Sequence, residues 1–314
     1  MNKLQGKLIV TGGVCLALFA TVAHAGSVLK TITDGNSVAQ FELGDTGNPD
    51  DRGQVLWTVD GIEQIFQQWF WFRVGNSQER SIEDGPDDGD LGPMRLDFTG
   101  TRDSNNDGDI DTLFARYEVD TNVTNAPPPF SVEILFRVDG GALGSGVSDI
   151  QEQIRIINTN AFGTPDLDLH FFQYVDFDLA GTPLDDTVAL LSSNTVLQTD
   201  GQGLMTAAET VVSPRATLHE LGVIGDPSVT ATRDKLDDGD ADNLDPTVLL
   251  RTDVNATWAF QWDLRIPAGG TALISKDKAI TFIIPVPIAI WPGLAALGML
   301  GAGSWYRRRQ SSGF

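Results

Sequence analysis

Cysteine is almost absent from this chain of 314 residues, and the single one, Cys15, lies in an apolar stretch near the N-terminus. The rest of the chain can therefore form neither a disulfide nor a cysteine-based metal site. Histidine is also scarce, with three residues in the whole sequence. The fold must depend on a packed core and on any ions that it binds.

Basic residues are in short supply as well. Lys and Arg number 21 against 43 Asp and Glu, which gives a net charge of -22 at pH 7. Nucleic acid is excluded as a partner, because binding to phosphates requires a basic face. The surplus of carboxylates suits an extracellular protein and supplies oxygen ligands for hard cations such as Ca²⁺.

Catalytic motifs are missing. His219 and Glu220 begin like the helix motif of zinc proteases, but Val223 occupies the position of the second histidine. The sequence has neither a nucleophile elbow nor a phosphate-binding loop, and we interpret His170 as a hydrogen-bonded structural histidine. We therefore expect no enzyme and assign no catalytic residue. A carboxylate pair for glycoside hydrolysis stays open as an alternative, because the fold brings such pairs together whatever their sequence spacing.

Helical periodicity is absent between the two ends of the chain, and apolar residues recur at every second position instead. The clearest cases are residues 132–138, 167–177 and 257–266. Turn-forming residues separate these segments. We expect residues 26–282 to form one all-β domain, an antiparallel β-sandwich, with a jelly roll as the alternative architecture.

Aromatic residues are concentrated in residues 67–74, which include Trp69 and Trp71. Bulky side chains on both faces favour a central strand that is buried on both sides. A carbohydrate-binding module is a second alternative function, because tryptophans on an exposed sheet face would stack on sugar rings. Burial of these tryptophans would remove that platform.

One acidic segment between two expected strands has the spacing of a calcium loop. Its oxygen-bearing side chains alternate, and Gly108 allows a sharp turn. Phe114 occupies the position of the closing glutamate, so a complete EF-hand is excluded. A bound Ca²⁺ and a solvated polar turn both remain open. The candidate ligands are Asp103, Asn105, Asp107, Asp109 and Asp111.

Two further acidic runs, at residues 84–90 and 234–245, lack this alternating pattern. Their carboxylates repel one another and favour hydration over packing. We therefore expect both runs to be mobile loops.

The N-terminal segment has the features of a secretory signal peptide, which we assign to residues 1–25. Two lysines precede an apolar run, and Ala23 and Ala25 form the cleavage site for signal peptidase. The apolar run is shorter than the roughly 20 residues that span a bilayer, which favours cleavage over a permanent anchor.

The C-terminal segment, residues 283–314, has the features of a membrane sorting signal. An uncharged apolar stretch at residues 288–306 is long enough to span a bilayer, and the arginines that follow it would stay on the cytoplasmic side. A Pro-x-Pro element precedes the stretch, and a tryptophan lies near its start. The residues that carry the pattern are Pro285, Val286, Pro287, Trp291, Arg307, Arg308 and Arg309.

This segment resembles the PEP-CTERM family of sorting signals, in the variant with a hydrophobic residue between the prolines. The resemblance covers about the last thirty residues of the sequence. It implies processing by an exosortase, a transient stay in the inner membrane, and delivery to the cell surface or the exopolysaccharide matrix. A plain tail anchor is the alternative. The body, at residues 66–75, 171–179 and 258–264, also resembles an uncharacterised group that carries this signal.

The sequence thus predicts an exported surface or extracellular matrix protein with a structural or binding role. An N-terminal signal helix and a C-terminal transmembrane sorting helix would flank its β domain. A carbohydrate-binding module and a secreted glycosidase or other hydrolase are the alternative functions.

Overall fold

The computed structural model describes residues 26–84, 94–123, 126–228 and 230–282. The signal segment with Ala23 and Ala25, and the sorting segment with its prolines, Trp291 and arginines, lie outside the described residues. Within the described part of the chain, we find no helix with the length and apolar character that crossing a membrane requires.

The described chain is all-β, and every strand pair is antiparallel, which confirms that part of the prediction. The strands are β1 (Leu29–Asp34), β2 (Ser37–Glu42), β3 (Gly53–Val59), β4 (Ile62–Glu63), β5 (Gln67–Val74), β6 (Arg80–Ser81), β7 (Met94–Arg102), β8 (Thr112–Val119), β9 (Phe130–Gly140), β10 (Val147–Asn158), β11 (Leu167–Asp176), β12 (Asp186–Ser192), β13 (Thr195–Thr199), β14 (Met205–Ser213), β15 (Leu218–Ile224), β16 (Leu250–Ile266) and β17 (Thr271–Phe282). The helical elements are η1 (Pro49–Asp51), η2 (Leu179–Gly181) and α1 (Thr232–Asp237).

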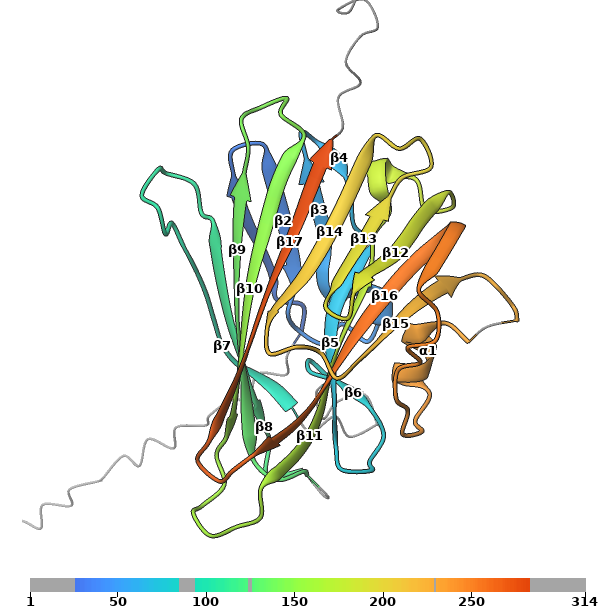
Figure 1. Cartoon of the computed structure of the whole chain (residues 1–314). Coiled ribbons are helices and arrows are strands. Elements are labelled where there is room, and N and C mark those ends of the chain that lie inside the picture. The colour runs from blue at the N-terminus through green and yellow to red at the C-terminus, as the bar shows by residue number, and fades with distance from the viewer. Residues whose placement is uncertain (1–25, 85–93, 124–125, 229, 283–314) are drawn as a thin grey trace, which may run out of the picture.

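The strands form two layers. The first layer runs β1-β2-β3-β5-β11-β16-β15, with β4 on β3 and β6 on β5. The second layer runs β7-β8-β9-β10-β17-β14-β13-β12. Figure 1 shows the second layer in front, with β2, β3 and β5 behind it.

The long strand β16 makes the two layers one network. Its first residues pair with β12 and the rest pair with β15 and β11, and Asp253 has a positive φ of 53° near the crossing point. At the opposite side, the Thr33 amide of β1 donates to the Ile110 carbonyl at 2.7 Å. The expected sandwich of two separate sheets is therefore replaced by a single sheet that is nearly closed.

Aromatic side chains fill the space between the layers. Phe70 and Phe72 of β5 meet Phe136 and Phe130 of β9, with ring centroids 6.3 Å and 5.3 Å apart. The tryptophans 69, 71, 258 and 262 are each no more than 1% exposed. None of these four can form a sugar-binding platform on the surface. Residues 67–73 of β5 are all buried, which confirms the expectation of a central strand that is buried on both faces.

The outer face of the first layer is covered as well. Helix α1 and the residues that follow it lie over β5, where Trp71 donates to Asp237 and Arg73 donates to the Asn243 side chain. Leu236 and Leu244 of this covering segment are buried. The expectation of a mobile loop at residues 234–245 is wrong, because contacts with distant strands hold this acidic run in place.

Candidate functional site

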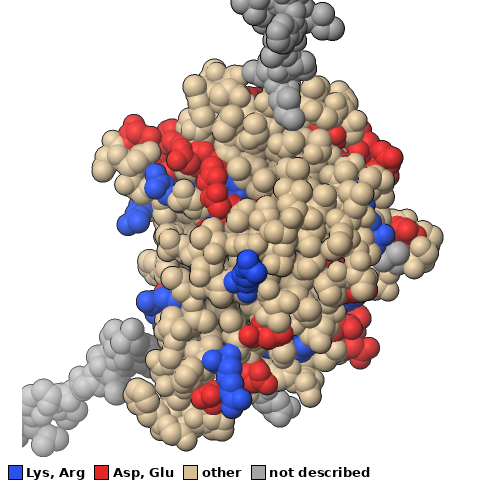
Figure 2. All heavy atoms as spheres, in the orientation of Figure 1, with Lys and Arg blue, Asp and Glu red and all other residues tan. Residues whose placement is uncertain are grey.

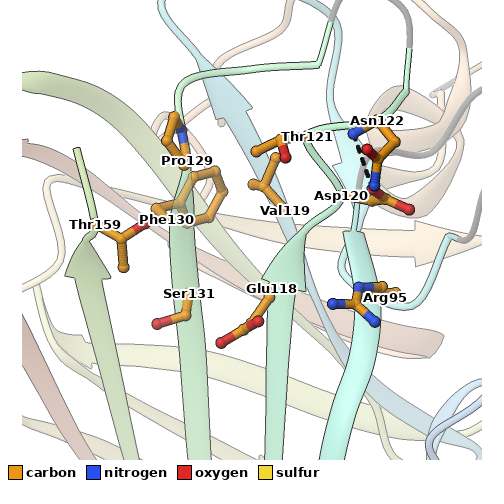
Figure 3. Close-up of a pocket in the computed structure, with 10 residues that line it drawn as sticks. All are labelled: Arg95, Glu118, Val119, Asp120, Thr121, Asn122, Pro129, Phe130, Ser131 and Thr159. Carbon is orange, nitrogen blue, oxygen red and sulfur yellow. Dashed lines mark hydrogen bonds between the residues drawn. The ribbon is translucent and has the colours of Figure 1, made fainter. Parts of the chain in front are cut away.

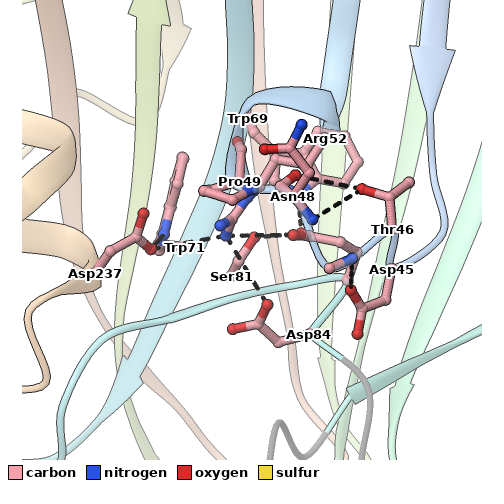
Figure 4. Close-up of polar contacts among 12 residues, drawn as sticks. Asp45, Thr46, Asn48, Pro49, Arg52, Trp69, Trp71, Ser81, Asp84 and Asp237 are labelled. Atoms are coloured by element: carbon pink, nitrogen blue, oxygen red, sulfur yellow. Dashed lines mark hydrogen bonds and ion pairs between the residues drawn. The ribbon is translucent and has the colours of Figure 1, made fainter. Parts of the chain in front are cut away.

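Arg52 lies at the start of β3, where several carboxylates meet over the outer face of the first layer. Its Nη1 atom is 3.4 Å from Glu83 Oε1, 3.7 Å from Asp237 Oδ1 and 3.9 Å from Asp84 Oδ1. The guanidinium also stacks over the Trp71 ring, 5.7 Å from its centroid. Figure 4 shows the guanidinium between Asp237 on one side and Asp84 below it.

The backbone geometry that places Arg52 requires a glycine at the next position. Gly53 has a φ of 77°, and a Cβ there would lie 2.3 Å from the Gln68 carbonyl oxygen and 2.4 Å from the Trp69 ring. Only glycine tolerates both the conformation and the close approach. The turn from η1 into β3 therefore places the Arg52 side chain against Trp71 of β5.

Glu83 is the buried carboxylate of the site, with 3% of its side chain exposed. Trp69 Nε1 and Ser81 Oγ both donate hydrogen bonds to its Oε2 atom. Burial raises the pKa of Glu83 to about 7, with Arg52 opposing the shift and Asp84 adding to it. This carboxylate faces the protein and holds Arg52 in position.

Asp84 is the accessible neighbour of Glu83, with 31% of its side chain exposed. Burial raises its pKa to about 6, the Arg52 charge lowers it, and the Asp237 and Asp45 carboxylates raise it further. A carboxyl group with a pKa in this range can hold a proton near neutral pH and release it to a substrate. A pKa in this range is one requirement of a general acid.

A surface pocket of about 130 Å³ opens beside these groups. Asp45 lies on its rim and accepts from the Gly47 amide at 2.9 Å, while Asn48 donates to Asp51 at 2.7 Å. The pocket, called the Arg52 pocket below, is lined by Asp45, Thr46, Gly47, Asn48, Pro49, Arg52, Glu83 and Asp84. It combines the buried Glu83 carboxylate, the partly exposed Asp84 carboxyl group of raised pKa and the partly exposed Asp45 carboxylate (Figure 4).

Sequence reasoning missed this site. Asp84 was assigned to a mobile acidic run, and Arg52 and Glu83 were not singled out. Arg52 is one of few basic residues in an acidic chain and follows two aspartates, which was the available signal. Its 31-residue separation from Glu83 gives no pattern that periodicity could detect.

The side chains of the candidate calcium loop form hydrogen bonds with other residues of the same loop. Asp103 accepts from the backbone amides of Asn106 and Gly108, at 2.6 Å and 3.0 Å. Asp111, at the other end, is buried and accepts from the amide and hydroxyl of Ser104, at 2.9 Å and 2.7 Å. Asn105 donates its side-chain amide to Asp107 at 2.8 Å. These bonds stabilise the loop without an ion.

Two of the five candidate ligands, Asp107 and Asp109, lie close to Asp34, which the sequence analysis did not identify as a ligand. Asp107 and Asp109 converge with Asp34, from the β1–β2 turn, so that one oxygen of each lies within 4.8 Å of the others. Burial raises the pKa of Asp34, the Gly140 amide opposes the shift, and Asp107 and Asp109 add to it. Figure 2 shows acidic side chains gathered over the 103–111 loop. A hard cation would relieve this repulsion.

A larger pocket of about 360 Å³ lies at the end of β7, β8 and β9. Arg95, Glu118 and Ser131 occupy paired positions on these three strands, and Figure 3 shows their side chains with Asp120 above. Glu118 is paired with Arg116 and Asp120 accepts from Asn122, so both carboxylates already have partners. The pocket has the polarity of a ligand site, and neighbouring side chains hold both of its carboxylates.

An apolar groove of about 290 Å³ lies on the outer face of the second layer. Phe98, which is 57% exposed, packs against Phe114 there, with ring centroids 5.9 Å apart. Among the described residues that line this groove there is no carboxyl group and no histidine. The Arg52 pocket is therefore the stronger candidate for chemistry.

No family model and no curated protein sequence matches the chain. Among solved structures, the chain is similar to a bacterial glucoamylase complexed with acarbose, at 9% identity and a TM-score of 0.49. It is also similar to the family GH92 α-mannosidase of Bacteroides thetaiotaomicron complexed with mannoimidazole, at 11% identity and a TM-score of 0.38. These alignments cover 88% and 83% of this chain, but only 35% and 30% of the other chains.

This comparison contradicts the expectation of a non-enzymatic structural or binding protein, because the similar structures are those of carbohydrate-active enzymes. The chain spans about a third of the length of these structures, and identity this low transfers no activity to it. The function of this chain has to be argued from its own residues.

Proposed function

We propose that this protein is a hydrolase of glycosidic bonds and that the Arg52 pocket is its active site. The observation that carries the proposal is the pairing of Asp84, whose pKa is raised to about 6, with the accessible carboxylate of Asp45 in one pocket. Glycoside hydrolysis needs two such carboxyl groups in unequal environments.

The negative charge of the pocket favours glycoside hydrolysis over acyl or phosphoryl transfer. Arg52 faces Glu83, Asp84 and Asp237, with Asp45 nearby, so carboxylates outnumber the single cation. Glycosidic cleavage passes through an oxocarbenium-like, positively charged transition state, which a surplus of carboxylates stabilises. Acyl and phosphoryl transfer develop negative charge, which the same surplus would repel.

Each group then has a role. Asp84 donates its proton to the oxygen of the leaving sugar, and Asp45 acts on the other side as base for water or as nucleophile. Glu83 is a positioning residue, since it is buried and contacts Arg52. Asn48 and Thr46 supply polar groups at the rim for sugar hydroxyls. The pocket would hold one sugar ring, with the remainder of the chain outside.

The test is hydrolysis of a panel of 4-nitrophenyl glycosides and end-labelled oligosaccharides by the purified protein. We expect cleavage of at least one member, with kcat lowered at least about 100-fold in Asp84→Asn. Asp240→Asn, an exposed aspartate outside the pocket, is the matched control and should retain activity. Absence of cleavage across the panel, or full activity in Asp84→Asn, would refute the proposal.

We also propose that the chain reaches the cell surface by signal peptidase cleavage after Ala25 and exosortase processing near Pro285 and Pro287. The sequence pattern of residues 1–25 and 283–314 supports this route. A secreted hydrolase in an exopolysaccharide matrix would meet its substrate there.

We further propose that Ca²⁺ binds Asp34, Asp107 and Asp109. The convergence of three carboxylates from two hairpins supports this proposal. The ion would tie the β1–β2 turn to the β7–β8 loop and would have a structural role.

A further inference from the structure

Two lysines and two glutamates lie between the layers, in the middle of the apolar core. Lys276 and Lys278 of β17, Glu152 of β10 and Glu209 of β14 are each no more than 2% exposed. Lys276 Nζ is 2.7 Å from Glu152 Oε2 and 3.0 Å from Glu209 Oε1, and Lys278 pairs with Glu152. Burial of four charges is costly, and hydrophobic residues could replace them without loss of stability. Their presence therefore calls for an explanation other than stability.

Lys278 reaches across the core to the other layer. Its Nζ atom lies 3.4 Å from the side-chain carbonyl oxygen of Gln54, which is on β3 and 0% exposed. The Gln54 side-chain nitrogen has no hydrogen-bond partner among the described residues. An amine, a carboxamide and the Glu152 carboxylate thus meet in a site closed to solvent.

The surroundings of Lys278 act against the charge on its amine. Burial lowers the pKa of Lys278, the Glu152 carboxylate opposes this shift, and the Lys276 charge adds to it. Glu152 is in direct contact and can take the proton. Fixed neighbours in a dry site react as if at very high concentration, because their encounter costs no further entropy.

We propose that Lys278 and Gln54 form an intramolecular isopeptide bond that joins the two layers covalently. The Lys278 ammonium gives a proton to the Glu152 carboxylate, and the neutral Nζ attacks Cδ of Gln54. The new N–C bond forms, the bond from Cδ to the Gln54 side-chain nitrogen breaks, and the proton lost by the attacking amine passes directly to that nitrogen. Ammonia leaves, and Glu152 keeps the proton that Lys278 first carried.

The charge of the core is balanced before and after this reaction. Before it, two ammonium groups face two carboxylates; afterwards Lys276 faces Glu209, and Glu152 is neutral. Escape of ammonia makes the step irreversible, and exclusion of water prevents hydrolysis of the carboxamide. The bond would link β3 to β17 in a chain whose described residues contain no cysteine.

Neighbouring glutamines are less suited to the reaction. Gln68 donates its amide nitrogen to Glu152 at 3.2 Å, and Gln173 donates to Glu209 at 3.1 Å. Their nitrogens are held in hydrogen bonds, whereas the Gln54 nitrogen has no such bond to break within the described part of the chain. Gln68 therefore provides a matched control, because it is equally buried and contacts the same glutamate.

The experiment is intact-mass spectrometry of the full purified chain under denaturing conditions, followed by mapping of its tryptic peptides. We expect the wild-type mass to be lower than the sequence mass by one ammonia, and the Gln54 peptide to be joined to the Lys278 peptide. Gln54→Leu and Glu152→Gln should both show the full mass, while Gln68→Leu should retain the loss.

Two results would overturn the inference. One is a wild-type chain of full sequence mass with the Gln54 peptide recovered unlinked. The other is a loss of ammonia that persists in Gln54→Leu, since it would then arise elsewhere. The wild-type peptide map decides the question even where a variant fails to fold.

Discussion

Trp71 Nε1 donates a hydrogen bond to Asp237 Oδ1 at 2.8 Å, across 166 positions of sequence. The same oxygen lies 3.7 Å from Arg52 Nη1. Strand β5 therefore fixes the end of helix α1 and, through it, one of the carboxylates that surround the guanidinium. The bond connects the doubly buried strand to the electrostatics of the pocket.

We predict that Asp237→Asn lowers the pKa of Asp84 and shifts the pH profile. The Asp237 charge raises the pKa of Asp84, which is about 6 in the wild type. If Asp84 acts as the acid, kcat/KM falls as pH rises through that value, and this limb should move to lower pH in the variant. Profiles of kcat/KM against pH for both proteins measure the shift. A uniform loss of rate with an unmoved limb would indicate a structural role only.

We predict that alanine at both Pro285 and Pro287 leaves the chain unprocessed in the inner membrane. The prolines carry the resemblance to the sorting signal, whereas a plain tail anchor needs no such element. Fractionation and immunoblotting of tagged full-length chains would show a larger, membrane-bound species. Unchanged processing of the double variant would contradict the exosortase route and leave the hydrolase proposal unaffected.

We predict that Ca²⁺ raises Tm and that Asp34→Asn abolishes this response. An ion that binds only the folded state adds about 2.7 kcal/mol at 100 times its Kd. Without Ca²⁺ the variant should melt at or above the wild-type temperature, because it removes one of three repelling carboxylates. Melting curves with CaCl₂ and with a chelator test both statements, and exposed Asp168→Asn is the control. Identical wild-type curves under the two conditions would rule out the ion.

The strands could be predicted from sequence because alternation records which face of a strand is buried. Residues 257–266 and 132–138 lie within β16 and β9 for this reason. Lys276 and Lys278 were not singled out, although they share the inward positions of Ile274 and Ile280 on β17. Charged residues are seldom buried, so the sequence pattern did not predict that these two lysines would lie in the core.

The candidate site could not be predicted, because its residues come from elements that meet only in the folded chain. Arg52, Glu83 and Asp237 are joined by contacts that span 31 and 185 positions. The position of α1 over β5 likewise depends on a long-range contact, the hydrogen bond from Trp71 to Asp237. The acidic composition of residues 234–245 suggested a hydrated loop, but contacts with distant strands hold this segment in place. The near closure of the sheet likewise depends on β16, whose two halves pair with different layers.

Asp176, at the end of β11, should make the fold less stable as pH rises. It is 2% exposed, and one of its oxygens has no hydrogen-bond partner among the described residues. Burial raises its pKa to about 8, and the Asp178 carboxylate adds to the shift, while Arg233 opposes it. In the unfolded chain an aspartate has a pKa of about 3.9.

The folded protein therefore retains a proton on Asp176 that the unfolded chain loses between about pH 4 and pH 8. The contribution of this group is complete below pH 4 and is lost as pH rises through the window, by up to about 1.4 kcal/mol per pH unit. Asp176→Asn should remove this part of the dependence, because its amide does not ionise. Urea unfolding at pH 5 and pH 8 measures the difference, with Asp168→Asn as the exposed control. Equal losses of stability in the wild type and Asp176→Asn would show that Asp176 ionises alike in both states.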